Sequence, residues 1–381
     1  MNSRNWLPII ATIAMASLAP SASEAQDRPL HHRPQLVEFD APGSATSSSG
    51  ACGQSCGTQA FANNDEGTIV GSYTDENVVA HGFLRTPGGQ FVAFDAPGAG
   101  LGAGLDQGTF AMSINDLGVI AGQVQDENNV FHGFVRDWKG SFVIIDGPDA
   151  GAAAFQGTAL FDINFEGATA GIEIDASNTV HGFLRLNGKN ISFDPPGSTY
   201  TFVCQETCLN QGDMVTGFYI DTSNVSHGFL RKRDGSITTL DAPGAGGGAG
   251  QGTTAASIDP EGAITGYFFD AGGAAHGFVR YSSGRYATFD APGGSSFTVA
   301  NTAAFSINLF GAVTGEALDT NSVMHGFVRS PYGSFTTFDA PGAGTGSGQG
   351  TRPSTNNLAG AVAGWWVDGN GVNHGFLRDP S

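Results

Sequence analysis

The sequence predicts an all-β fold, a seven-bladed β-propeller in which the N-terminal strand completes the last blade. Three observations lead to this prediction. The pentapeptide HGF[LV]R occurs seven times, at a spacing of 46 to 51 residues, and D-x-P also occurs seven times. Each unit holds four short strand signals separated by Asn, Asp and Gly turns. Four strands per repeat of this length are typical of propeller blades.

The second unit illustrates the four strands, which we expect at residues 109–115, 118–126, 130–136 and 141–146. Pro148 follows the fourth strand, as expected for a residue that cannot donate to a sheet. No window shows the 3.6-residue periodicity of a helix. A β-solenoid is the main alternative, although its rungs are usually shorter and its ends need capping.

The two ends of the chain favour a closed ring. Residues 35–43 supply a fourth strand with no preceding partners, and residues 374–381 end on a third strand with no fourth. We therefore expect residues 36–381 to form a single domain whose first strand pairs with its last. Closure of this kind removes the exposed edge of an open sheet array.

Each HGF[LV]R histidine is expected to pair with the D-x-P aspartate across a hairpin. The usual spacing is 14 residues, and it falls to 13 where the loop shortens to Asn187-Gly188, a two-residue type I′ signal. The expected pairs are His81–Asp95, His132–Asp146, His181–Asp194, His227–Asp241, His276–Asp290, His325–Asp339 and, through closure, His374–Asp40. Such a pair would satisfy two polar groups inside a blade.

A second aspartate lies six residues before each histidine, and strand register alone leaves it open as the partner instead. These residues are Asp75, Asp126, Asp175, Asp221, Asp270, Asp319 and Asp368. General acid–base chemistry is the functional alternative for the pairs, but sevenfold repetition favours a structural role. The arginines of HGF[LV]R are expected either to pair with surface carboxylates or to contribute only solubility.

Residues 1–25 have the pattern of a secretory signal peptide: Arg4, an apolar stretch and a small-residue cleavage site at Ser23 and Ala25. Residues 26–35 would form a leader, and an uncleaved N-terminal anchor is the alternative. In an exported chain, the two local cysteine pairs predict disulfides, Cys52–Cys56 and Cys204–Cys208, rather than metal or redox sites. We expect a secreted protein, periplasmic or extracellular.

Composition excludes several functions. The net charge of -19 disfavours nucleic acid and acidic membrane surfaces as partners. No hydrolase, metalloprotease or phosphate-binding motif occurs. We expect no cofactor and no metal; calcium at acidic turns such as 126–129 and 368–371 is the open alternative, against ordinary Asx turns.

Together, HGF[LV]R, FDAPG and S-I-N-x-x-G-x-[IV]-x-G resemble the bacterial extracellular repeats of the HAF family. The resemblance covers nearly all of residues 36–381, although the motif here is HGF rather than HAF. It implies an exported repeat protein and brings no catalytic residues with it.

In a ring of copies, function is expected where the copies differ. The most variable segments join D-x-P-G to the next strand, and we expect all of them on one ring face. They are residues 44–57, 99–108, 150–156, 198–208, 245–252, 294–300 and 343–350. The preferred function is a monomeric, non-enzymatic binding scaffold for a glycan or protein ligand. The alternatives are an exported polysaccharide hydrolase or lyase with its site at the ring centre, and a self-assembling envelope protein.

Overall fold

The computed structural model describes residues 35–47, 56–102, 107–203, 207–293 and 299–380, which are built from β-strands and turns. All of them belong to one compact unit, Pro34–Ser381. The predicted signal peptide and leader lie outside the described residues, apart from Gln35. Within the described ranges, no helix is long or apolar enough to cross a lipid bilayer.

The strands are short, and most span four to seven residues. The first half of the chain forms β1 (Leu36–Phe39), β2 (Gly57–Asn63), β3 (Ile69–Thr74), β4 (Ala80–Arg85), β5 (Phe91–Phe94), β6 (Gly108–Ile114), β7 (Ile120–Gln125), β8 (Phe131–Arg136), β9 (Phe142–Ile145), β10 (Gly157–Ile163), β11 (Thr169–Ile174), β12 (Val180–Leu186) and β13 (Lys189–Phe193). The second half forms β14 (Ser198–Val203), β15 (Val215–Asp221), β16 (Ser226–Arg231), β17 (Ile237–Leu240), β18 (Gly252–Ile258), β19 (Ile264–Phe269), β20 (Ala275–Arg280), β21 (Tyr286–Phe289), β22 (Val299–Ile307), β23 (Val313–Asp319), β24 (Met324–Arg329), β25 (Phe335–Phe338), β26 (Gly350–Asn356), β27 (Val362–Val367) and β28 (Asn373–Arg378).

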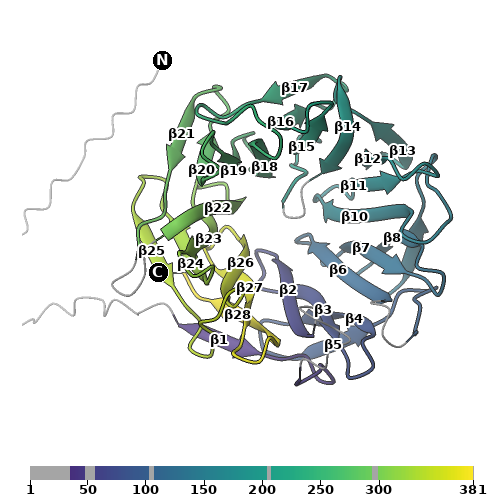
Figure 1. The fold of residues 1–381 in the computed structure, drawn as a ribbon. Coiled ribbons are helices and arrows are strands. Elements are labelled where there is room, and N and C mark those ends of the chain that lie inside the picture. Colours follow the sequence, from purple (N-terminus) through teal and green to yellow (C-terminus); the bar gives the residue numbers. More distant parts are fainter. Residues whose placement is uncertain (1–34, 48–55, 103–106, 204–206, 294–298, 381) are drawn as a thin grey trace, which may run out of the picture. The chain divides into compact units, whose positions relative to one another are not determined.

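Antiparallel pairing joins consecutive strands into four-stranded sheets. The sheets consist of strands β2 to β5, β6 to β9, β10 to β13, β14 to β17, β18 to β21, β22 to β25, and β26 to β28 together with β1. The first described strand therefore supplies the outer strand of the last sheet, with Leu36 opposite Arg378 and Phe39 opposite Gly375. Within the Pro34–Ser381 unit, the sheets surround a common centre toward which β2, β6, β10, β18 and β26 lie, the arrangement of a β-propeller (Figure 1).

Turn chemistry holds the outer hairpins in register. Gly89, in the loop between β4 and β5, has a φ of 82°, and Gly140, Gly235, Gly284 and Gly333 also have positive φ. The shorter loop has φ values of 52° at Asn187 and 75° at Gly188, as a type I′ turn requires. Each HGF[LV]R glycine consequently lies opposite the residue before the D-x-P aspartate, as Gly82 does with Phe94.

The HGF phenylalanines form the repeated core of the sheets. All are fully buried: Phe83, Phe134, Phe183, Phe229, Phe278, Phe327 and Phe376. Each packs where the neighbouring strand carries a glycine; a Cβ on Gly71 would lie 2.9 Å from the ring of Phe83. Burying one such ring contributes about 1.5–3 kcal/mol. The glycine in the second strand of each sheet is thus a packing requirement.

Five of the seven HGF[LV]R arginines differ from both expectations, because they stack on aromatic rings. Arg85 lies over Phe39, 4.7 Å from Cζ to the ring centroid, and Arg136, Arg231, Arg329 and Arg378 make the same contact with the preceding sheet. Arg185 and Arg280 follow sheets that carry Ile145 and Leu240 at the ring position, and among the described residues they have no such contact. The contact therefore forms only where the preceding strand offers a phenylalanine.

A buried threonine locks each sheet to the one before it. Thr58 Oγ1 accepts a hydrogen bond of 2.9 Å from the N–H of Ala41, and Thr109, Thr158, Thr253, Thr302 and Thr351 repeat the contact. Pro195 replaces this donor in one sheet and has no N–H. There Thr201 donates its hydroxyl to Asp194 instead. A threonine hydrogen bond is thus retained at this position, although the hydroxyl donates here and accepts in the other sheets.

The connections between sheets differ from the prediction in one place. Residues 198–203 form β14, the first strand of its sheet, rather than a loop on the ring face. The chain turns directly from Pro195 into this strand, and the cysteine-bearing segment follows the strand's end. In four other connections a glutamine orders the loop: Gln107, Gln156, Gln251 and Gln349 accept from a loop N–H. These four connections, which vary in sequence, thus share the same glutamine hydrogen bond.

Candidate functional site

The structure brings each HGF histidine to the aspartate at the end of the neighbouring strand. The Nδ1 to carboxylate distances are 2.8 Å for His81–Asp95, 2.7 Å for His132–Asp146, 2.6 Å for His181–Asp194, 2.8 Å for His227–Asp241, 2.7 Å for His276–Asp290, 2.9 Å for His325–Asp339 and 2.9 Å for His374–Asp40. The hairpin register accounts for these short distances. Each histidine lies just before the first residue of its strand that pairs with the neighbouring outer strand, and its aspartate lies just after the last paired residue of that outer strand.

The second aspartate reaches the other ring nitrogen. The Nε2 of His81 lies 3.8 Å from Asp75, and the other six histidines lie 3.5–3.9 Å from the corresponding residue. These aspartates also build Asx turns: Asp75 Oδ1 accepts from the N–H groups of Asn77 and Val79. Both candidate partners therefore lie beside each imidazole.

These clusters lie at the protein surface, which corrects the expectation that they sit inside a blade. The side chain of Asp40 is half exposed and that of His374 is partly exposed. The strands end here, so no further sheet covers them. Burial lowers the pKa of His374, but the hydrogen bond and charge of Asp40, with the charge of Asp368, outweigh it and raise the pKa overall. His181 and His276 are raised in the same way by their own aspartates.

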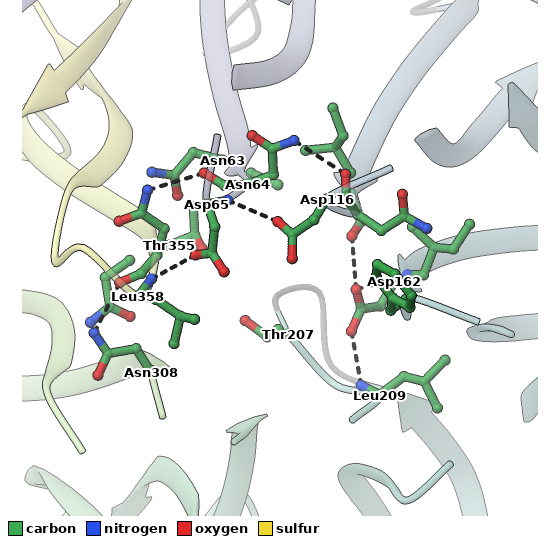
Figure 2. Close-up of a pocket in the computed structure, with 18 of the residues that line it drawn as sticks. Asn63, Asn64, Asp65, Asp116, Asp162, Thr207, Leu209, Asn308, Thr355 and Leu358 are labelled. Carbon is green, nitrogen blue, oxygen red and sulfur yellow. Dashed lines mark hydrogen bonds between the residues drawn. The ribbon is translucent and has the colours of Figure 1, made fainter. Parts of the chain in front are cut away.

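A pocket of about 160 Å³ opens among the turns that join the first and second strands of the sheets; we refer to it as the turn pocket (Figure 2). A β-bulge near the end of the first strand, as between Ala60 and Ala62 in β2, aims the last residues toward it. All of the sheets contribute lining residues, among them Asn64, Asn115, Asp162, Leu209, Ile258, Asn308 and Asn357.

A belt of side-chain amides surrounds this pocket. The Nδ2 of each asparagine donates to the carbonyl of the corresponding residue in the next sheet. The links are Asn64 to Asn115 at 3.2 Å, Asn115 to Asn164 at 3.0 Å, Asn164 to Asn210 at 3.2 Å, Asn210 to Asp259 at 3.1 Å, Asn308 to Asn357 at 2.9 Å and Asn357 to Asn64 at 3.0 Å. Asp259 has no amide to give, so among the described residues the belt is open between Asp259 and Asn308.

Sequence analysis included this asparagine position in the S-I-N-x-x-G motif but assigned it no role, although a signal was present. In six of the seven repeats, an Asn or Asp stands three residues before a glycine of positive φ, as in Asn64 and Gly67. Asp213 takes the glycine's place after Asn210, also at positive φ. The pattern looks like an ordinary Asx turn, and only the ring shows that the side-chain amide reaches the next sheet.

Two carboxylates face the turn pocket from neighbouring sheets (Figure 2). Asp116 accepts the N–H of Asp65 at 2.9 Å, and Asp65 accepts the N–H of Leu358 at 2.8 Å. Burial raises the pKa of Asp65, and the charges of Asp116 and Glu66 raise it further against the hydrogen bond from Leu358. Each carboxylate keeps an oxygen for which no partner occurs among the described residues, so both can accept from a ligand.

A third carboxylate, Asp162, is deeply buried beside the pocket. It accepts from the Ser113 hydroxyl at 2.7 Å and from the N–H groups of Ile163 and Leu209 at 2.8 Å. Burial raises its pKa to about 6 despite these donors. Its oxygens are occupied by protein, so its contacts hold the chain after β14 against β10.

Apolar side chains on the same turns reach solvent. Leu117, Phe165, Phe310 and Leu358 are all exposed, and Phe310 retains 66% of its accessible surface. Phe165 and Leu358 also line the turn pocket. A pocket that combines apolar side chains with a few polar groups is typical of a ligand site.

The cysteine predictions fall mainly outside the described residues, because Cys52 and Cys204 lie there. Cys56 and Cys208 are both buried. Thr207, next to Cys208, points into the turn pocket (Figure 2). Thr207 therefore lies at the turn pocket, whereas Cys56 directly precedes the first strand of its sheet, β2. Within the described ranges, no group of three or more His, Cys, Asp or Glu could hold a metal ion.

Comparison with known proteins gives likeness of fold only. No family model matches the chain, and no curated protein matches it. Among solved structures, a puromycin hydrolase bound to PGG is 14% identical with a TM-score of 0.50, covering 87% of this chain and 55% of its own. A lectin from Burkholderia pseudomallei is 10% identical with a TM-score of 0.49 and coverages of 85% and 97%. TolB from Acinetobacter baumannii is 11% identical with a TM-score of 0.42 and coverages of 82% and 80%.

Proposed function

We propose that this chain is an exported, seven-bladed propeller of HAF-type repeats that binds a neutral carbohydrate at the turn pocket. The seven HGF[LV]R copies and the pairing of β1 with β28 support seven blades. The pattern of residues 1–25 supports export, to the periplasm or beyond the cell. We also propose the local disulfides Cys52–Cys56 and Cys204–Cys208, which would suit that compartment.

One observation carries the binding proposal: Asp65 and Asp116 face a pocket whose surrounding turns expose Phe165, Phe310 and Leu358. Carboxylate oxygens accept hydrogen bonds from sugar hydroxyls, and an apolar ring covers the C–H face of a sugar. Loops on a rigid scaffold are the usual place for such recognition.

Charge selects the class of ligand. The chain has a net charge of -19, and the pocket adds two carboxylates, so polyanions are repelled. A neutral glycan meets no such barrier and can use the free oxygens of Asp65 and Asp116. The proposed partner is therefore an uncharged saccharide.

A glycan binding screen with the mature protein, followed by calorimetry, tests the proposal. We expect the double variant Asp65→Asn, Asp116→Asn and the single variant Phe165→Ser each to weaken binding at least tenfold. Leu101→Ser, which changes an exposed apolar residue on a connection between sheets, is the control and should bind normally. Failure of every neutral glycan to bind, or full binding by the double variant, would contradict the proposal.

A hydrolase or lyase at the ring centre is the competing function, and the raised pKa of Asp162 is the observation in its favour. A general acid must present its proton to the substrate. Asp162 instead accepts three hydrogen bonds from the protein, which favours binding over catalysis. Release of reducing ends from a bound oligosaccharide, abolished by Asp162→Asn, would favour the enzyme.

A further inference from the structure

A second pocket, of about 260 Å³, lies among β19, β22, β23 and β26. We refer to it as the aromatic pocket. Its lining includes Tyr267, Phe269, Asn301, Phe305, Glu316 and Arg352. It differs from the turn pocket in its place along β22: Asn301 and Phe305 line the aromatic pocket, whereas Ile307 and Asn308, at the strand's end, line the turn pocket.

Glu316 and Arg352 are the charged residues of this pocket. Glu316 is only 8% exposed, and its Oε2 is buried without a hydrogen bond. Arg352 Nε lies 3.8 Å from that oxygen, too far for a hydrogen bond. The guanidinium lies over Phe305 at 4.9 Å and over Trp365 at 5.2 Å. Among the described residues, no protein hydrogen bond to either charged group occurs; the Glu316 oxygen is left unsatisfied, whereas the Arg352 side chain is 34% exposed and reaches solvent.

The other sheets show that this pair is specific to one place in the ring. Glu316 lies opposite Ala303, and Arg352 lies opposite Trp365, at one cross-strand position of the inner hairpin. The corresponding pairs elsewhere are Ser72 with Gln59, Gln123 with Phe110, Ile172 with Ala159, Phe218 with Phe202, and Tyr267 with Thr254. None of these residues is charged. A buried and poorly paired carboxylate costs stability, so a structural role does not account for it.

We propose that the aromatic pocket is a second ligand site, which takes one neutral saccharide ring with a hydroxyl shared between Glu316 and Arg352. A hydroxyl can donate to the carboxylate and accept from the guanidinium at once. The walls formed by Tyr267, Phe269 and Phe305 cover the apolar face of the ring. This site shares its ligand class with the proposed function but uses no residue of the turn pocket.

The two charges restrict the ligand further. A cationic ligand that approached Glu316 would meet Arg352, and an anionic ligand that approached Arg352 would meet Glu316. Burial raises the pKa of Glu316, while the charge of Arg352 lowers it. Uncharged ligands avoid both repulsions, which favours a hexose, a deoxyhexose or an N-acetylhexosamine.

Tryptophan fluorescence of the mature protein reports on this site, because Trp365 contacts Arg352. We expect at least one neutral monosaccharide to change the emission with a Kd near 1 mM or below, in a titration to about 50 mM. Glu316→Gln and Arg352→Met should each weaken this binding tenfold or more. Glu316→Gln retains the size of the side chain and removes a buried charge, and Arg352→Met retains an unbranched apolar side chain, so each should fold; circular dichroism checks this.

Gln123→Ala, at the same position in another sheet, is the matched control and should bind normally. The double variant Asp65→Asn, Asp116→Asn should also retain this signal, which separates failure of the turn pocket from failure of this site. The inference is overturned if no neutral monosaccharide changes the emission, if Glu316→Gln and Arg352→Met bind like the wild type, or if zwitterionic amino acids bind and sugars do not.

Discussion

The guanidinium of Arg85 lies over the ring of Phe39, with 4.7 Å between Cζ and the ring centroid. Phe39 belongs to β1, which pairs with β28, whereas Arg85 ends β4 in the next sheet. This contact therefore joins the first described strand to the first complete sheet. It is the same contact that Arg136 makes with Phe94, formed here between the two ends of the ring.

Replacement of Phe39 by Leu should lower the free energy of unfolding by about 1–2 kcal/mol, through loss of the cation–π contact and of ring burial. Urea denaturation measures the change. In a double-mutant cycle, Phe39→Leu and Arg85→Met should show a coupling of about 1 kcal/mol, because methionine carries no cation. The control cycle uses Leu240→Ala and Arg280→Met, where no stacked ring occurs among the described residues, and a coupling there as large as at Phe39 would contradict the assignment.

Asp40→Asn should destabilise the protein more in mild acid than in base. Asp40 raises the pKa of His374 in the folded state, so the protonated imidazole stabilises the fold. This contribution is complete below the unfolded pKa of about 6.5 and is lost as the pH rises through the folded pKa. Melting temperatures should therefore differ more between the wild type and Asp40→Asn at about pH 5.5 than at about pH 9.

The exposed carboxylate Asp379, just beyond β28, provides the control for this comparison. Asp379→Asn should leave the pH dependence of melting unchanged. An equal loss for Asp40→Asn at both pH values would show that the charge of His374 contributes nothing.

Asp259→Asn should stabilise the fold, because the new amide can donate to the Asn308 carbonyl and close the belt. A hydrogen bond of this kind contributes about 0.5–1.5 kcal/mol. Burial raises the pKa of Asp259, so the wild type loses stability as the pH rises from the unfolded value of about 3.9. The gain in melting temperature should accordingly be larger at neutral pH than at about pH 4.

The opposite substitution, Asn to Asp, in the next sheet should lower stability instead of raising it. Asn308→Asp removes the donor to Asn357, which lies 2.9 Å away, and should lower the melting temperature. If Asp259→Asn and Asn308→Asp shift it in the same direction, the belt does not contribute as described.

Thr253→Val should cost more stability than Thr201→Val. Thr253 accepts from the buried N–H of Ala242, and its loss leaves that donor unsatisfied, at a cost of about 1–3 kcal/mol. Thr201 donates to Asp194, whose side chain is 40% exposed and can be solvated by water. Chemical denaturation of both variants measures the difference. Equal losses in the free energy of unfolding would contradict the reversed direction of the threonine hydrogen bond beside Pro195.

Local features were predictable from the sequence because spacing alone specifies them. The shift from 14 to 13 residues between His181 and Asp194 indicated the type I′ loop, and the structure has positive φ at Asn187 and Gly188. The positions of the short strands were also close, as for the expected 130–136 and the observed Phe131–Arg136. These features depend on one hairpin at a time.

Contacts between repeats could not be derived in this way. The stacking of Arg85 on Phe39 depends on how neighbouring sheets approach, and the expectation of surface ion pairs was wrong. Residues 198–203 were expected in a connection on the ring face, but Pro195 leads directly into β14. The aromatic pocket joins Glu316 and Arg352 from different repeats at positions where no motif repeats.

The amide belt has a consequence for how such proteins change in length. Each repeat that carries asparagine at this turn brings one donor and one acceptor to the belt, whereas the Asp259 repeat brings only an acceptor. Gain or loss of a complete asparagine-bearing repeat would therefore leave the other hydrogen bonds of the belt matched. The belt alone therefore does not fix the number of repeats. Duplication of such a repeat could enlarge the ring and still leave every asparagine amide of the belt with a carbonyl partner. Loss of part of a sheet would instead leave an amide without its partner.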